Sequence, residues 1–360
     1  MNKPRREIII IGAGLAGLTL AYRLNQKGIR PLILEARDRI GGRIHTSEQS
    51  STTLELGATW FADKHHHLLS LVNELNLSFE EQFYGKLGIY EAENGQVQLF
   101  EMPHQPEKTY RFSEGTSSLI NALFTHINSK DLLLSHKVQS VHFENDLAHI
   151  STSNGEFEAE LIINTLPPNL AINGIKYAPE LPSDVKDLAA QTHTWMGESI
   201  KVGFFSTSAF WKERGIGTFY SQRGPITEMY DHSNSHGFAM KGFMHDQFIQ
   251  LPKQEREIAV RQQLSNVFGE DIIKQVTYIE EAWRNEKLTF LDYPSYVGPH
   301  QNNGIPQLRA PLANGKLILA GSETASEYPG YMDGAVEAGE TIADQVLTRI
   351  RRQANVEIQP

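Results

Sequence analysis

The sequence contains no cysteine in its 360 residues. A disulfide framework, a thiolate nucleophile, a cysteine-ligated metal and a cysteinyl cofactor linkage are therefore excluded. A chain of this length can bury a core large enough to need no such links. It also exceeds the usual size of one compact domain, so we expect two lobes around a cleft.

Basic charge and long apolar runs are also scarce. The formal net charge of -10 argues against binding to nucleic acid or to an anionic membrane surface. No apolar run reaches the roughly 18 residues of a transmembrane helix. Arg5 and Arg6 precede a short isoleucine run that ends in glycines, too short for a signal-peptide core. We therefore expect a soluble, cytoplasmic protein that does not bind membranes.

A glycine-rich turn near the N-terminus follows an apolar strand and begins a helix. Gly12, Gly14 and Gly17 form a G-x-G-x-x-G pattern, and Glu35 ends the next expected strand. The first glycine permits a tight turn, the second permits backbone N–H groups to approach a pyrophosphate, and the helix N-terminus carries about half a positive charge. Glu35 can accept hydrogen bonds from ribose hydroxyl groups. The βαβ unit over residues 7–35 therefore predicts a dinucleotide site.

Later segments leave this nucleotide fold and return to it. Residues 66–77 have the apolar spacing of an amphipathic helix, and residues 131–166 alternate as an antiparallel meander that ends in a buried strand. Residues 316–321 predict another buried strand, and residues 334–350 a closing helix. A dinucleotide-binding domain built from separate segments follows from this order.

Four blocks of the sequence resemble the flavin-containing amine oxidase family. They are GAGLAGL through GGRIHT (residues 12–46), ELGATW (55–60), MGESIKVGFF through AFW (196–211) and LILAGSETASEYPGYMDGAVEAGE (317–340). The blocks span the chain from end to end and keep their order. The first includes a second glycine pair, Gly41 and Gly42, which in this family lies against the same pyrophosphate.

The resemblance implies an α/β, two-domain flavin amine oxidase-like fold with a discontinuous Rossmann-type FAD domain and a smaller mixed-sheet substrate domain. We expect the FAD domain over residues 1–80, 113–167 and 284–353. The substrate domain is expected over residues 81–112 and 168–283, with residues 354–360 as a tail. Many relatives carry a long helical insertion after the first FAD segment, and its absence here predicts a trimmed substrate lobe.

The resemblance also implies the residues that contact FAD. Glu323 matches a carboxylate near the ribityl and pyrophosphate region, and Val138 matches the residue whose backbone meets adenine. Met332 matches the backbone N–H at the flavin pyrimidine edge, where a helix N-terminus would stabilise a reduced anionic flavin. The expected FAD contacts are Gly12, Gly14, Ala16, Gly17, Glu35, Ala36, Arg37, Gly42, Arg43, Gly57, Ala58, Thr59, Val138, Glu323 and Met332.

Four residues match catalytic positions of the family. Lys201 matches a lysine that hydrogen-bonds a water next to flavin N5, although alone it could be a strand-edge lysine reaching solvent. Trp283 matches an aromatic residue near the flavin, with a core tryptophan as the alternative. Tyr331 matches one wall of an aromatic cage over the flavin, and Tyr293 matches the other. Asp292 stands where some relatives carry the cysteine that attaches FAD, so we predict non-covalent FAD.

The resemblance implies an amine oxidase. Hydride passes from the amine α-carbon to flavin N5, the imine hydrolyses, and O2 reoxidises the flavin to give H2O2. The partners are thus a small-molecule amine and O2, and we allow for a homodimer. Monoamine, polyamine and amino-acid substrates stay open. Two alternatives also stay open, namely a FAD-dependent desaturase or dehydrogenase of the same superfamily and a flavin-binding protein without amine turnover.

The run His65, His66 and His67 raises the question of a metal site. Consecutive residues on a helix point in different directions, so these imidazoles cannot converge on one ion. We interpret the run as a polar helix start and expect no metal.

Overall fold

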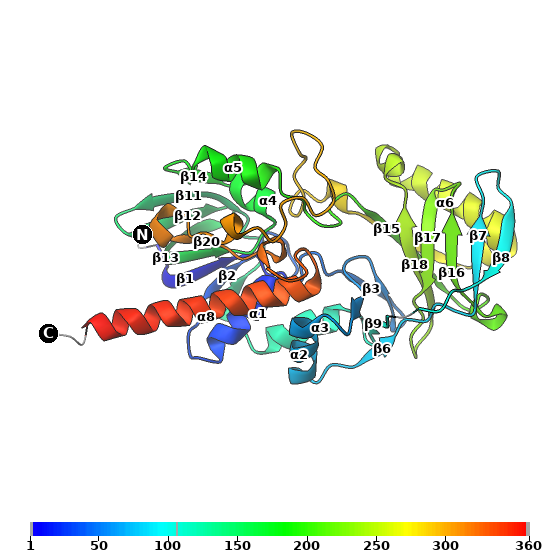
Figure 1. Cartoon of the computed structure of the whole chain (residues 1–360), viewed down its shortest axis with the longest axis horizontal. Helices are drawn as coiled ribbons and strands as arrows, with labels where there is room; N and C mark the ends of the chain where they lie inside the picture. The colour runs from blue at the N-terminus through cyan, green and yellow to red at the C-terminus, as the bar shows by residue number, and fades with distance from the viewer. Residues whose placement is uncertain (1–2, 106, 358–360) are drawn as a thin grey trace.

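Two large β-sheets lie toward opposite ends of an elongated molecule in the computed structural model (Figure 1). The structure describes residues 3–105 and 107–357. Within these ranges, no helix combines the length and apolar character needed to cross a bilayer.

The first sheet has a parallel core because its central strands are buried on both faces. Residues Ile8–Ile11 in the first strand are each 3% exposed or less. The strand order is β10-β2-β1-β13-β12-β11-β14, with β20 also paired to β13. The strands are β1 (Arg5–Ile11), β2 (Leu32–Leu34), β10 (Leu132–Leu133), β11 (Val138–Glu144), β12 (Leu147–Thr152), β13 (Gly155–Asn164), β14 (Lys176–Ala178) and β20 (Leu317–Leu319).

Helices cover both faces of this sheet. Ile8 and Ile10 of β1 pack with one group of helices, whereas Ile9 and Ile11 pack with the other, because alternate strand residues face opposite sides. The first group is α1 (Leu15–Asn25), α2 (His66–Glu74), α3 (Ser117–Thr125) and α8 (Met332–Glu357). The second group is α4 (Pro168–Asn173) and α5 (Ser183–Ala190).

The first domain extends further along the chain than the sequence suggests. Residues 168–190 were expected in the substrate domain, yet α4, α5 and β14 all belong to the first sheet or its core. The reason is that β14 hydrogen-bonds in parallel beside β11, which closes that edge of the sheet. The boundary after residue 167 is therefore too early.

The second sheet is mixed, with the order β19-β15-β18-β17-β16-β7-β8. Helices α6 (Lys253–Phe268) and α7 (Glu270–Ile273) contribute to the apolar core on one of its faces. Its strands are β7 (Leu87–Glu91), β8 (Val97–Glu101), β15 (Ile200–Ser206), β16 (Ile216–Ser221), β17 (Ile226–Asp231), β18 (Phe238–Met244) and β19 (Thr277–Ala282). Two small sheets complete the fold. One consists of β3 (Thr46–Gln49) and β4 (Thr52–Glu55). The other has the order β5 (Phe61–Ala62), β9 (Thr109–Phe112) and β6 (Phe79–Glu81).

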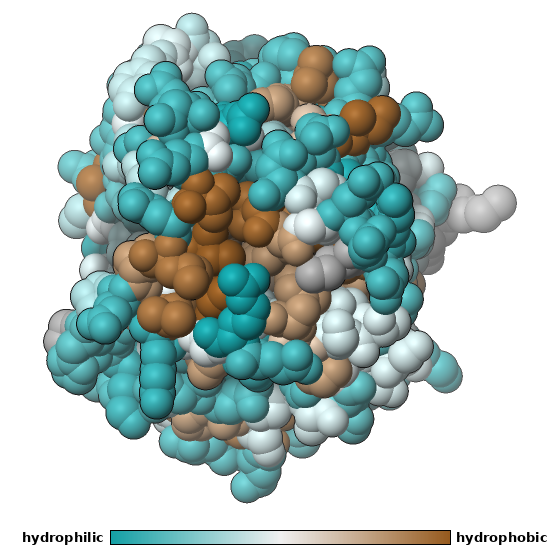
Figure 2. Space-filling view, turned by 90° about the vertical axis from the view of Figure 1, so that its right-hand side faces the viewer, coloured by the Kyte–Doolittle hydropathy of each residue, from teal (hydrophilic) through white to brown (hydrophobic). Residues whose placement is uncertain are grey.

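The end of the molecule formed by the second sheet carries an exposed apolar patch (Figure 2). Strand β8 is the last strand at this end, and its Val97 and Leu99 side chains are 39% and 50% exposed. The last strand of the second sheet therefore leaves apolar side chains on the surface.

Candidate active site

One cavity of about 360 Å³ collects residues from all parts of the chain. Its wall includes the turn between β1 and α1, the loops after β2 and β13, and the start of α8. Another part of the wall comes from the second sheet, which contributes Lys201 and Phe243. The segment of residues 57–60 completes it. Because the carboxyl ends of parallel strands are the usual ligand edge of such sheets, this cavity is the candidate site.

The turn between β1 and α1 is shaped for close approach by a ligand. Gly12 has φ +103°, and a Cβ atom there would lie 2.8 Å from the Thr165 hydroxyl oxygen. Helix α1 begins at Leu15, and its N-cap residue, Gly14, provides no side-chain cap. Its first backbone N–H groups therefore remain available to an anion.

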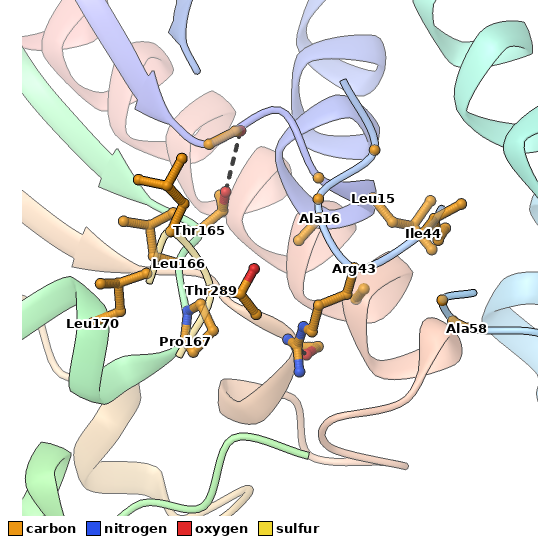
Figure 3. A pocket seen from close by; sticks show the side chains of 18 of the residues that line it. Leu15, Ala16, Arg43, Ile44, Ala58, Thr165, Leu166, Pro167, Leu170 and Thr289 are labelled. Atoms are coloured by element: carbon orange, nitrogen blue, oxygen red, sulfur yellow. Dashed lines mark hydrogen bonds between the residues drawn. The ribbon is translucent and has the colours of Figure 1, made fainter. Parts of the chain in front are cut away.

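A second glycine loop packs against this turn. Gly41 forms a bridge with Gly14, and a Cβ atom on Gly42 would lie only 3.3 Å from the Gly14 Cα. The loop turns back at this point, and its positive φ angles at Gly41 and Gly42 suit glycine. Figure 3 shows Arg43, which follows this loop, across the cavity from Thr165, Leu166, Pro167 and Leu170.

Glu35 closes the nucleotide end of the cavity. Its side chain is 4% exposed, one carboxylate oxygen accepts from Ala13 N at 2.8 Å, and the other accepts from Arg37 N at 2.8 Å. Each oxygen retains a further acceptor site for a ribose hydroxyl group. An uncapped helix N-terminus, two glycine loops and this carboxylate therefore fit the adenosine and pyrophosphate portions of FAD.

Arg43 joins the second glycine loop to the C-terminal segment. It donates to Glu323 at 2.6 and 3.0 Å and to the Ser322 hydroxyl at 2.7 Å. Glu323 is fully buried, which alone would raise its pKa, but the Arg43 guanidinium outweighs burial and holds the pKa below its usual range. The pair fixes a cationic side chain in the wall of the cavity without leaving a buried charge unpaired.

Lys201 lies at the opposite end of the cavity. It is 6% exposed, and its Nζ donates to the Gly57 carbonyl oxygen at 2.5 Å. Burial lowers the pKa of Lys201 to about 8, and the Glu55 carboxylate partly opposes this shift. A lysine that snorkels to solvent is thus ruled out, because this amine faces the interior.

A second buried lysine, Lys241, lies beside Lys201 and was not predicted. It is 0% exposed, donates to the Thr59 hydroxyl group and lies 4.2 Å from the Trp60 ring centroid. Burial lowers the pKa of Lys241 well below its usual value, and the neighbouring Lys201 lowers it further. Burial among these groups therefore disfavours the charged form of Lys241 relative to an exposed lysine.

Tyr331 and Tyr293 were expected to form the two walls of an aromatic cage. Tyr331 lines the cavity, where it stacks on His300 at 5.6 Å and approaches Trp195 at 5.5 Å. Tyr293 is not among the residues that line the cavity; its hydroxyl oxygen accepts from Thr194 N at 2.8 Å and its ring packs edge-on against Phe290. The placement of Tyr293 opposite Tyr331 over a bound flavin stays a prediction.

Most of the other predicted residues line the cavity. Those that do are Gly12, Gly14, Ala16, Glu35, Ala36, Arg37, Gly42, Arg43, Gly57, Ala58, Thr59, Val138, Lys201, Trp283, Tyr331 and Met332. Gly17 instead lets α1 pack closely against the turn that precedes it, since a Cβ atom there would lie 2.1 Å from the Gly12 carbonyl oxygen. Glu323 stands behind Arg43. Thr165 and Thr289 were missed, although Thr165 directly follows a parallel strand and could have been found from that position.

The fold and the cavity together define a FAD-dependent oxidoreductase, with a dinucleotide domain built from separate segments and a buried lysine supplied by a second domain. Residues 15–107 and 79–347 match the model of the family described as flavin containing amine oxidoreductase. The chain belongs to that family.

Relatives and solved structures agree with this assignment. The chain is 22% identical to a probable flavin-containing monoamine oxidase A of Dictyostelium discoideum, over 96% of this chain and 98% of the relative. It is 24% identical to flavin-containing amine oxidase A of Sus scrofa, over 98% of this chain and 87% of the relative. Putrescine oxidase bound to putrescine aligns with a TM-score of 0.81 at 20% identity, over 96% of this chain and 99% of that one. Cyclohexylamine oxidase from Brevibacterium oxydans IH-35A aligns with a TM-score of 0.82 at 20% identity, over 97% of this chain and 100% of that one.

The predicted fold class, the FAD cofactor and the class of amine oxidoreductase are thereby confirmed. The solved structures, at this identity, support the fold alone. The chain has no cysteine, so its FAD is not held through a cysteinyl bond.

Proposed function

We propose that this protein is an oxidase of small-molecule amines that uses O2 as electron acceptor. The observation that carries the proposal is the buried Lys201 amine at the end of a cavity whose other end fits a dinucleotide. Bound FAD would accept the hydride from the amine α-carbon at N5 and deliver two electrons to O2, which gives H2O2. The imine formed from a primary amine would take up one water molecule and yield a carbonyl compound and ammonia.

The protein residues would bind and orient the amine rather than form a bond with it. An alkyl ammonium titrates near 10, so the reactive neutral amine is scarce at pH 7. Tyr331, Trp195 and Trp60 supply an apolar aromatic wall that lowers the local water content and disfavours the cation. Lys201, held by the Gly57 carbonyl oxygen, would position a water molecule for reoxidation or imine hydrolysis.

The start of α8 would stabilise negative charge on the cofactor. Met332 is 8% exposed and lines the cavity at the first turn of this 26-residue helix. The N-terminus of such a helix carries about half a positive charge. An anionic reduced flavin would be favoured at this position.

Product stoichiometry tests the proposed reaction. One molecule of a primary amine should yield one carbonyl compound, one ammonia and one H2O2 for each O2 consumed. A desaturase or dehydrogenase acting on carbon–carbon bonds would release no ammonia from the same substrates. A flavin-binding protein without turnover would yield no H2O2, so either result would refute the proposal.

The cofactor should leave the protein intact on denaturation. Because the sequence has no cysteine and Asp292 replaces the attachment residue, we expect acid or heat to release all flavin as unmodified FAD. The measurement is the absorbance of the supernatant and of the pellet, with chromatography against authentic FAD. Flavin absorbance that stays with the precipitated chain would contradict a non-covalent site.

A further inference from the structure

Two buried lysines of the second sheet are joined by a chain of hydrogen bonds. Lys241 of β18 donates to the Thr59 hydroxyl group, and that hydroxyl group donates to the Gly57 carbonyl oxygen at 3.2 Å. The Nζ atom of Lys201, in β15, donates to the same carbonyl oxygen at 2.5 Å. These four residues are here called the lysine chain. Three of them line the cavity, whereas Lys241 is 0% exposed and is not among the lining residues.

Strand register brings the two lysines to the same face of the second sheet. Strands β15 and β18 are neighbours in this sheet (Figure 1). Lys201 pairs with Phe243, and two residues further along β15, Gly203 pairs with Lys241. Directly paired residues and alternate residues of one strand project from the same face. Both Nζ atoms therefore lie near the Phe243 ring, 5.4 and 5.7 Å from its centroid.

Packing alone does not account for Lys241. Burial disfavours its charged form, and an apolar side chain of the same length would fill the space without that cost. A strongly perturbed titratable group beside a cavity is a candidate for a role in the chemistry of that cavity. The part of the cavity that Lys241 can act on is the wall it contacts, at Thr59.

The Thr59 hydroxyl group links the position of Lys241 to that of Lys201. A hydroxyl group has one hydrogen atom to donate, and its oxygen atom can accept. Because Lys241 donates to the oxygen atom, the hydroxyl hydrogen is left for the Gly57 carbonyl oxygen. That carbonyl oxygen has two acceptor sites, and Thr59 and Lys201 use one each. The lysine chain therefore fixes where the Lys201 amine lies at the end of the cavity.

We propose that Lys241 is a positioning residue that orients the Lys201 amine through Thr59 and Gly57. This inference rests on the proposed function, in which Lys201 positions a water molecule for reoxidation or imine hydrolysis. Lys241 acts from behind the cavity wall, so its effect on the reaction passes entirely through Lys201. Without Lys241, the Thr59 hydroxyl group is free to rotate, and the Lys201 amine loses its fixed direction.

A double-mutant cycle tests this dependence. Lys241→Met keeps the length of the side chain and removes its donor. In FAD-loaded protein reduced with dithionite, we expect Lys241→Met to slow reoxidation by O2 about 10-fold, but less than about twofold when Lys201 is already methionine. Lys108→Met is the matched control, because the Lys108 side chain is 59% exposed, and it should leave reoxidation unchanged in both backgrounds.

Equal slowing by Lys241→Met in both backgrounds would overturn the proposal, because Lys241 would then act independently of Lys201. Wild-type reoxidation in Lys241→Met would overturn it as well. FAD content and melting temperature show whether the variant is folded. If Lys241→Met does not fold, Thr59→Val replaces it, because it removes the linking hydroxyl group and should slow reoxidation only when Lys201 is present.

A measurement on the apoprotein supplies a readout that needs no cofactor. The backbone N–H groups of Gly57 and Ala58 donate to the carbonyl oxygens of His45 and Arg43, each at 3.1 Å. Hydrogen exchange of a peptide covering residues 55–60 should be several-fold faster in Lys241→Met than in the wild type, and unchanged in the exposed control. Unchanged exchange in Lys241→Met would contradict the lysine chain.

The outcome for Lys241 is separable from the outcome for the proposed function. Dithionite supplies the electrons in the double-mutant cycle, so the cycle requires no amine turnover. If no amine reduces the flavin, the proposed function fails, and the reoxidation rates and the exchange rates still decide whether Lys241 acts through Lys201.

Discussion

Replacement of Arg43 by methionine is expected to weaken FAD binding by about 100-fold or more and to lower the melting temperature. Arg43 contacts Glu323 at 2.6 and 3.0 Å, and Glu323 is 0% exposed. Removing one partner of a buried ion pair leaves an uncompensated charge, which costs about 3–5 kcal/mol. The remaining carboxylate would also repel the pyrophosphate. Titration of the apoprotein with FAD, followed by flavin fluorescence, measures the affinity.

Two further variants show whether these losses are specific to the Arg43–Glu323 ion pair or follow from removal of any arginine. Arg43→Met combined with Glu323→Gln removes both charges, so it should regain part of the lost thermal stability. Arg30→Met breaks an ion pair with Asp131 in which the arginine side chain is 56% exposed, and it should change stability by less than about 1 kcal/mol. Wild-type FAD affinity in Arg43→Met would contradict the role given to this pair.

Replacement of Lys201 by methionine is expected to lower activity and raise stability at once. Loss of the amine at the reacting end should slow the water-dependent step by about 100-fold. Burial lowers the pKa of Lys201 from 10.5 to about 8, and at 1.36 kcal/mol per pKa unit its removal should stabilise the folded state by about 3 kcal/mol at pH 7. The measurements are stopped-flow flavin reduction and reoxidation, together with thermal melting.

The difference in stability between the wild type and Lys201→Met should become smaller as the pH rises. Below about pH 8 both the folded and the unfolded chain hold the proton on Lys201, so the full cost of burying the charge is present. Between about 8 and 10.5 the folded chain has released the proton that the unfolded chain retains, so wild-type stability rises relative to the variant. The melting difference should therefore shrink as pH rises from 7 to 10. A difference that stays constant would contradict a depressed pKa, and exposed Lys108→Met serves as the control with no such trend.

The sequence predicted the nucleotide end of the cavity well because its determinants are local. Gly12, Gly14 and Glu35 lie within one βαβ unit, where each residue's task follows from its position at a strand end or a helix start. The structure places all three in the cavity wall. Arg43 and Glu323 are 280 positions apart, and the contact between their side chains was not predicted.

The sequence indicates the flavin end less directly because its geometry depends on contacts between distant segments. Tyr293 was assigned by its match to the family; in the structure its hydroxyl oxygen accepts a hydrogen bond from Thr194 N, whereas Trp195 and His300 contact Tyr331. Neither of these residues carries a signal in the sequence that points to the cavity. Tyr328, the other tyrosine of the final turn, packs edge-on against His65.

Strand register explains why Lys241 was missed. A shift of one residue in β18 would turn its side chain to the opposite face of the sheet. In the observed register Lys201 pairs with Phe243 and Gly203 pairs with Lys241. Only this pairing shows that Lys241 shares the face of Lys201.

Anaerobic titration of the FAD-loaded protein with amines tests the central claim most directly. A panel of monoamines, diamines and amino acids would be mixed with the protein in the absence of O2 while flavin absorbance is recorded. The account predicts that at least one amine bleaches the oxidised flavin band and that admission of O2 restores it with formation of H2O2. Flavin that stays oxidised with every amine, although dithionite reduces it, would contradict the account.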